Sequence, residues 1–421
     1  MKMETLKSKN ISIRQIFLCR RAWLLFWTVN ILLLRWSIVW NVAKMLLCRN
    51  GFGYHEYSCP KCGSKKRIPH TCKSRFCSSC GKVATDKWVE TSLSQMLDVE
   101  YKHLVFTLPK QFRDWFLKNR KPCLDAFFIA VKDTLLDYAE QRDFRPGVIC
   151  VLHTFGSNLN WNSHIHVIIT AGGLSLNNDE WIRHPYFPQD VIRPLYRYRF
   201  LQEFKKLFKE GLLTPPPACK NIRSYEIFNS WLTQFYKKEW YVNIGRTLKE
   251  SSHTVRYVGR YTKRPVMAES RIEFFDGNLV TFSYKDYSNN TIVATTVNVE
   301  EFIARLIRHI PDQHFKNIRH SGIFANRVRT KCIATARLLL NQTPKQKPLP
   351  LSFQQRYKKT FNIDPLACNN CGTPMLLSAV VIVHTKTVME RVENKHQELI
   401  ENYHTKKEAQ EKNRLCKPRS P

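Results

Sequence analysis

The sequence predicts a chain of mixed helices and short strands that carries a cysteine-rich segment near its N-terminus. Five cysteines fall between Gly51 and Gly81, which marks that segment off from its surroundings. Asp276-Gly277 between two β-branched and aromatic runs is a strong hairpin signal. Apolar residues at helical spacing follow Asn298, so strands give way to a helix there.

Composition and charge indicate a folded protein with a polyanionic partner. The 421 residues include 67 Lys and Arg against 34 Asp and Glu, a formal net charge of +33. Hydrophobic residues make up 43%, which excludes a disordered polycation, and the length suggests two or three domains. Nucleic acid is the usual partner of such a surplus, although charge alone also allows an anionic membrane surface or an acidic protein.

The cysteines are expected to be reduced. The most apolar stretch, Ala22 to Leu34, is shorter than the ~20 residues that span a bilayer, and no secretory signal is recognisable. We therefore expect no membrane partner and a location in the bacterial cytoplasm near the nucleoid. In that compartment, paired cysteines are more often metal ligands than disulfides.

The expected elements fall into four regions: an N-terminal helical region without chemistry of its own (1–50), a zinc-binding domain (51–98), a catalytic domain (99–342), and a linker, a CxxC knuckle and a basic tail (343–421). Turn and periodicity signals place the elements within them. Expected helices cover 11–48, 88–97, 111–140 with a break near Pro122, 188–212, 231–249, a segment from Ser251 or Ser252, and one from Asn298; expected strands cover 103–108, 148–154, 164–170, 271–275, 279–284 and 291–297, and the tail 406–421 is expected to fray.

Two CxxC pairs predict a zinc site. Cys59-x2-Cys62 and Cys77-x2-Cys80 lie 14 residues apart, the spacing of a four-cysteine site, with Cys72 as a further possible ligand. Buried free cysteines are the alternative. Lys73 and Arg75 lie within the cluster and are candidates for DNA contact or for a solvated face. A third pair, Cys368-x2-Cys371, has no obvious mate and is either half of a zinc site or a structural turn.

A pair of histidines can form a metal platform. His164 and His166 are two apart on an expected strand, so their side chains point to one face while Ile165 points to the other. His153 on the preceding strand could pair across the hairpin. An isolated HxH is more often a pair of core or surface histidines, and the nearby His153 is what favours a metal site here.

The run from Leu152 to Leu174, LHTFGSNLNWNSHIHVIITAGGL, resembles the HUH motif of rolling-circle transposases of the insertion-sequence-91 family. The segments TCKSRFCSSCG, HLVFTLP, YVGRYTKRP, VTFSYKDY and EFIARLIRHIPDQHFKNIRHSGIFA agree with it in the same order, over roughly residues 50 to 380. The resemblance implies an α+β fold. A central antiparallel sheet carries the histidines, helical insertions lie on one face, and a cysteine zinc-binding domain precedes the sheet.

The resemblance also implies nucleophiles. Tyr257 and Tyr261 are four apart on an expected helix and can face one site, although an isolated YxxxY is more often a packing pair. In two-tyrosine members this motif attacks a DNA phosphate and leaves a 5′-phosphotyrosine and a free 3′-hydroxyl. Catalytic Mg²⁺ or Mn²⁺ and structural Zn²⁺ are the implied cofactors. The implied partner is single-stranded or hairpin DNA. The residues that could contact it are Arg256, Arg260, Lys263 and Arg264, and a solvated helix face is the alternative interpretation of these four.

One position departs from the family pattern. A histidine usually stands two residues before the HUH pair, and Asn162 stands here, which leaves His153 as the candidate third ligand. Two other functions fit part of the sequence. A rolling-circle replication initiator shares the HUH site, and a non-catalytic zinc-dependent DNA-binding regulator explains the charge and cysteines but not the histidine and tyrosine pairs.

Overall fold

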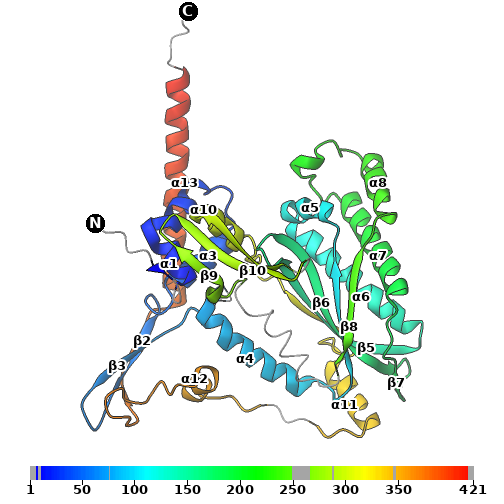
Figure 1. Ribbon diagram of the computed structural model, residues 1–421, viewed down its shortest axis with the longest axis horizontal. Helices are drawn as coiled ribbons and strands as arrows, with labels where there is room; N and C mark the ends of the chain where they lie inside the picture. Colours follow the sequence, from blue (N-terminus) through cyan, green and yellow to red (C-terminus); the bar gives the residue numbers. More distant parts are fainter. Residues whose placement is uncertain are drawn as a thin grey trace, which may run out of the picture.

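The computed structural model describes residues 6–7, 11–74, 76–248, 266–286, 289–344 and 348–415. Within these ranges the strands form three antiparallel sheets (Figure 1). The α+β class implied by the sequence is confirmed. The expected helix from Ser251 or Ser252 lies outside the described residues.

The largest sheet has the strand order β12-β5-β6-β4-β8, and β7 pairs with β6. Its strands confirm the three expected near residues 103, 148 and 164. The helix expected over 231–249 is wrong in its second half. That stretch forms β8, because Val242 and Ile244 fill the edge of the sheet beside β4. The strands are β4 Tyr101–Thr107, β5 Phe144–Phe155, β6 Trp161–Ser175, β7 Trp181–Arg183, β8 Tyr241–Leu248 and β12 Ile318–Gly322.

Four helices cover one face of this sheet and share its main apolar core. They are α5 Arg113–Lys118, α6 Arg120–Glu140, α7 Gln189–Lys209 and α8 Tyr225–Thr233. The break between α5 and α6 lies at Asn119, three residues before the expected position. Its side-chain amide bonds both the carbonyl and the N–H of Thr214. Pro122 lies in the first turn of α6, where a missing N–H costs little.

Helices also cover the opposite face, which corrects the expectation of helices on one side only. Trp88 and Leu93 of α4 Ser78–Gln95, and Ile333 of α11 Arg329–Leu339, pack against Ile149 and Ile168 of the sheet. Figure 1 shows the sheet between the two helical layers. Alternation along β6 places His164 and His166 on the α4 side, since Ile165 and Val167 belong to the other core.

A second sheet packs with the N-terminal helices. Asp276-Gly277 makes the expected hairpin between β9 and β10, with Gly277 at φ +96° and the Asp276 carboxylate accepting from the N–H groups of Asn278 and Leu279. The helix expected after Asn298 is confirmed, and the Asn298 side chain accepts from the Glu301 N–H at 2.7 Å. The strands are β1 Leu6–Lys7, β9 Ile272–Phe275, β10 Leu279–Asp286 and β11 Thr291–Asn298; the helices are α1 Ile13–Leu18, α2 Ala22–Val29, α3 Trp36–Leu46 and α10 Val299–Ile307.

The C-terminal region returns to the N-terminal third of the chain. β13 Leu376–Ile382 pairs with β2 Gly53–Ser58, which pairs with β3 Lys65–Pro69. α12 Phe353–Phe361 contacts α4 through Arg356 and Lys359, both on Glu90. α13 Thr385–Leu415 packs on α3 and continues through the segment expected to fray, as far as Leu415. The expected C-terminal region (343–421) therefore contacts both the expected zinc-binding domain (51–98) and the N-terminal helical region (1–50).

Short 3-10 turns complete the described elements, at Cys19–Arg21, Lys110–Phe112, Pro217–Cys219, Gln234–Tyr236 and Glu269–Arg271. Among the described residues, no helix has both the length and the apolar character needed to cross a bilayer. The apolar stretch that begins at Ala22 instead buries Trp23 and Trp27 against the second sheet and its helices.

Candidate active site and metal centres

Three histidines converge on the α4 side of the large sheet. His153 on β5 is the direct register partner of His164 on β6, and His166 follows two residues later. One ring nitrogen from each of the three lies within 4.8 Å of the others. The pairing of His153 across the hairpin agrees with the sequence prediction. This donor set has the size and the chemistry to hold one transition-metal or Mn²⁺ ion.

Hydrogen bonds orient two of the rings. His164 Nδ1 lies 2.8 Å from the Asn162 carbonyl oxygen, which can only accept, so Nδ1 carries the proton and Nε2 keeps a lone pair. Burial lowers the pKa of His164, and burial lowers that of His166 to about 2. Both imidazoles are therefore neutral at physiological pH, which is the form that binds metal.

A fourth histidine supports this group and was missed in the sequence. His103 Nε2 lies 2.9 Å from His166 Nδ1, and burial lowers the pKa of His103 as well. A partner on Nδ1 fixes the orientation of a ligating ring, as outer groups do around metal sites. His103 is the first residue of the HLVFTLP segment, but its contact with His166 depends on the pairing of β4 with β6, which places His103 opposite Ile168.

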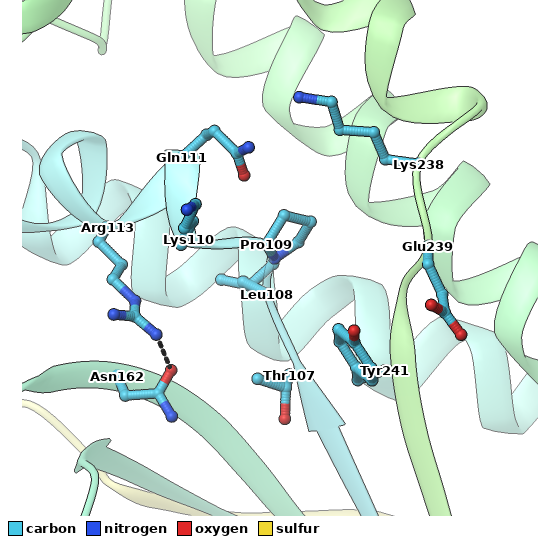
Figure 2. A pocket seen from close by; sticks show the side chains of 10 residues that line it. All are labelled: Thr107, Leu108, Pro109, Lys110, Gln111, Arg113, Asn162, Lys238, Glu239 and Tyr241. Atoms are coloured by element: carbon cyan, nitrogen blue, oxygen red, sulfur yellow. Dashed lines mark hydrogen bonds between the residues drawn. The ribbon is translucent and has the colours of Figure 1, made fainter. Parts of the chain in front are cut away.

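Asn162, which stands where the family usually has a histidine, contacts Arg113. The Arg113 Nη2 donates to Asn162 Oδ1 at 3.1 Å, as the dashed line in Figure 2 shows. Asn162 thereby joins the wall of an open cleft of about 450 Å³. The lining residues are Thr107, Leu108, Pro109, Lys110, Gln111, Arg113, Asn162, Lys238, Glu239 and Tyr241.

This cleft adjoins the imidazole group. Thr107 is the register partner of His164 on one side and of Tyr241 on the other. The cleft carries cationic side chains from Lys110, Arg113 and Lys238, while the Tyr241 ring is 62% exposed. A basic cleft with an exposed aromatic ring suits a nucleotide, which offers a phosphate and a base face. No sequence motif pointed to it, because its walls come from three separate segments.

Several predicted site residues are not placed. Tyr257 and Tyr261 lie outside the described residues, and so do Arg75, Arg256, Arg260, Lys263 and Arg264. Lys73 is described. It is exposed and has a φ of +52°, directly after Cys72.

The cysteines form two groups of four, which corrects the single site predicted from Cys59, Cys62, Cys77 and Cys80. The first group contains Cys48, Cys72, Cys77 and Cys80, and the second contains Cys59, Cys62, Cys368 and Cys371. Cys72 therefore belongs to a group of four possible ligands. The third pair, Cys368 and Cys371, lies beside Cys59 and Cys62. Cys48, in the region expected to lack chemistry, supplies the fourth thiol of the first group.

The β2–β3 hairpin explains why the two expected pairs cannot meet. Cys59 and Cys62 lie in the turn at its tip, between Ser58 and Lys65, whereas Cys72 follows the end of β3 at its base. Five residues of strand separate tip and base by roughly 17 Å. The spacing of 14 residues matched a zinc site, but the intervening residues include the extended strand β3.

The first group has the environment of a metal–thiolate site. Its four cysteines are buried, Cys72 Sγ lies 3.6 Å from Cys80 Sγ, and Cys48 Sγ lies 3.8 Å from Cys80 Sγ. The backbone N–H groups of Cys72 and Ser74 donate to sulfurs of the group. A hydrogen bond from Cys72 lowers the pKa of Cys48 to about 7, while the same contact raises the pKa of Cys72. A divalent ion would replace these shared protons.

Comparison with known proteins finds transposase families over both regions that carry these sites. A family model described as a putative transposase matches residues 147–332, which include His153, His164 and His166. A model described as a transposase zinc-binding domain matches residues 28–108, which include the whole first cysteine group and Cys59 and Cys62. No solved structure gave a significant match.

Two curated relatives cover most of the chain. The transposase for insertion sequence element IS801 of Pseudomonas savastanoi pv. phaseolicola is 32% identical over 81% of this chain and 83% of its own length. The putative transposase y4qJ of Sinorhizobium fredii is 29% identical over 79% of this chain and 86% of its own length.

The fold, the sites and these matches define the class of protein as a transposase, an enzyme that processes DNA. More narrowly, the chain belongs to the insertion-sequence-91 family of transposases, with the zinc-binding domain of that family. DNA is accordingly its partner, and zinc has a structural role.

The first cysteine group yields a test. Cys48→Ser should remove one zinc ion per chain and lower the melting temperature, because a structural zinc site needs all four ligands. Zinc content is measured by elemental analysis of the purified chain, and unfolding by circular dichroism. Cys19→Ser is the matched control, since Cys19 lies in the same helical region but in neither group. Equal zinc content in Cys48→Ser and the control would rule the site out.

Proposed function

We propose that this transposase nicks and rejoins single-stranded DNA at the ends of its element through a 5′-phosphotyrosine, as in rolling-circle transposition. The convergence of His153, His164 and His166 on one sheet face is the observation that supports this best. Transposases that use carboxylates to hold metal would need acidic groups there. Three imidazoles instead favour the HUH chemistry that the sequence resembles.

The imidazole group fits a catalytic divalent ion. All three donors are ring nitrogens, a set that suits Mn²⁺ better than Mg²⁺. When bound, the ion would polarise the scissile phosphate and stabilise charge on the leaving 3′ oxygen. The protein holds the rings ready for this role, through the Asn162 carbonyl on His164 and through His103 on His166.

Tyr257 and Tyr261 are the proposed nucleophiles. A phenolic oxygen would attack phosphorus and lose its proton, and the 3′ oxygen would leave and take up a proton as a hydroxyl. The new P–O bond replaces the broken one, so strand joining can reverse the step without ATP. Two tyrosines would allow a second strand to be cut while the first adduct persists. The family resemblance supports these roles.

The cleft in Figure 2 is the proposed path of the strand beside the imidazole group. Lys110 and Lys238 are exposed and can neutralise backbone phosphates, and Arg113 is held by Asn162 at the same wall. The exposed Tyr241 ring offers a stacking surface to an unpaired base, which a base inside a duplex could not reach. Single strands or hairpin ends are therefore the favoured substrates over continuous duplex.

Two other functions are less well supported. A replication initiator would use the same chemistry, but both curated relatives are transposases. A non-catalytic regulator would leave the buried imidazole group without a role. Denaturing gels of a 3′-labelled oligonucleotide with Mn²⁺ separate enzyme from regulator, because only an enzyme leaves label attached to protein.

Removing the imidazoles should abolish metal binding at this site. His164→Ala with His166→Ala should weaken Mn²⁺ binding by more than the roughly 10- to 100-fold that loss of an outer group costs. Binding is followed by electron paramagnetic resonance of free Mn²⁺. His320→Ala is the control, because His320 lies on the same sheet in β12 but lines a different pocket, with Ile149 and Phe324. Unchanged Mn²⁺ affinity in the double variant would contradict the metal assignment.

The tyrosines should carry the covalent step. Tyr257→Phe combined with Tyr261→Phe should abolish protein–DNA adducts on a 3′-labelled strand while leaving DNA binding intact, since only the nucleophilic oxygens are lost. Tyr241→Phe, which keeps the ring in the cleft, serves as the control and should form adducts. Adducts at the parental level in the double variant would overturn this role, and peptide mapping would then identify the attacking residue.

The cleft should contribute to the salt dependence of binding. Each phosphate contact adds about 0.7 to the slope of log affinity against log salt on single strands, so Lys110→Ala with Lys238→Ala should lower the slope by about 1.4. Fluorescence anisotropy with an oligonucleotide measures this. The control removes two lysines from α13, Lys386→Ala with Lys395→Ala. A slope that falls equally in both pairs would contradict a specific path through the cleft.

A further inference from the structure

The second cysteine group combines residues from opposite ends of the chain. Cys59 Sγ lies 3.5 Å from Cys371 Sγ, and Cys62 Sγ lies 3.6 Å from Cys368 Sγ and 3.7 Å from Cys371 Sγ. Four sulfurs around zinc at about 2.3 Å are about 3.8 Å apart, the edge of a regular tetrahedron. The observed separations are close to that edge, so the group has the dimensions of a zinc–thiolate site.

The two CxxC turns share one backbone conformation. In each, a glycine follows the second cysteine with positive φ, +69° at Gly63 and +71° at Gly372. The glycine N–H donates to the carbonyl of the first cysteine, at 3.0 Å for Gly63 and 2.9 Å for Gly372. The N–H of each first cysteine donates in turn to the residue after the glycine, at 2.8 Å to Ser64 and 3.0 Å to Thr373.

Positive φ is the reason for glycine at these two positions. A Cβ atom at Gly63 or Gly372 would have no neighbour within 4 Å, so lack of space does not explain the choice. Glycine is favoured because it adopts φ near +70° without strain. Two segments 309 residues apart thus build the same turn, and each turn directs two sulfurs to a common point.

Other contacts hold the two turns together. β13 pairs with β2 from Leu376 opposite Ser58 to Ile382 opposite Gly53. Lys66 Nζ donates to the Ala367 carbonyl at 3.2 Å and to Asn369 Oδ1 at 3.0 Å. The C-terminal turn is therefore fixed to the hairpin on both sides of its cysteines, and the sulfurs meet in a supported position.

We propose that Cys59, Cys62, Cys368 and Cys371 bind a second structural zinc ion, which fastens the C-terminal segment to the β2–β3 hairpin. The matched zinc-binding domain ends at residue 108 and contains only half of this ligand set. The remaining half comes from beyond the catalytic sheet. The ion would thus connect the N-terminal zinc region with the segment between α12 and α13, independently of the chemistry at the histidines.

Zinc counts in paired variants test whether the four cysteines share one ion. The background is His164→Ala with His166→Ala, so that zinc at the imidazoles does not enter the count. Native mass spectrometry should then show two zinc ions in the parent and one after Cys59→Ser with Cys62→Ser. It should also show one after Cys368→Ser with Cys371→Ser, and still one when all four are changed. The variant Cys123→Ser, at a buried cysteine outside both groups, should keep two.

Three outcomes would overturn the proposal: one ion in the parent, no loss in either pair, or a further ion lost when the pairs are combined. If a paired variant fails to fold, the parent chain decides the question. The metal-free parent is titrated with Co²⁺, and thiolate-to-cobalt charge-transfer absorption is followed. Saturation at two equivalents supports two thiolate sites, and saturation at one refutes the second.

Discussion

The antiparallel pairing of β5 with β6 is the constraint on which the geometry of the candidate active site depends. It sets His153 directly opposite His164 and leaves His166 on the same face. Because side chains alternate along a strand, a shift of one residue would move both β6 histidines into the core that α6 and α7 cover. The apolar residues that alternate with them, Ile165 and Val167, are fully buried there and hold the register. The residues that stabilise the sheet therefore also determine on which face the imidazoles lie.

Polar groups around the histidines extend this arrangement. The Asn162 carbonyl orients His164, and the Asn162 side chain binds Arg113 at the wall of the cleft. One residue thus joins the candidate metal ligands to the basic surface beside them. The departure from the family pattern at position 162 places an amide where a third imidazole is usual, and a ring nitrogen of His153, on the neighbouring strand, lies within 4.8 Å of those of His164 and His166.

Sequence patterns predicted the elements whose structure depends on residues close together in the chain. The hairpin at Asp276-Gly277, the helix after Asn298 and the strands that carry the histidines all follow from turn chemistry and periodicity. The pairing of cysteines did not, because spacing cannot reveal that the 14 intervening residues include the extended strand β3. Cys48, His103 and the return of Cys368 and Cys371 depend on contacts between distant segments. β8 was taken for a helix, since only the open edge of β4 makes its residues extended.

The position of β13 has a consequence for biosynthesis. β2 receives its outer neighbour from residues 376–382, which are synthesised long after residues 53–69 of the hairpin. Until then the hairpin presents an unpaired strand edge, the kind of surface that invites association with other chains. A copy of the gene cut short before this strand would yield a protein with that edge permanently open. Damage to the gene in this late segment would thus affect a hairpin near the other end of the described chain.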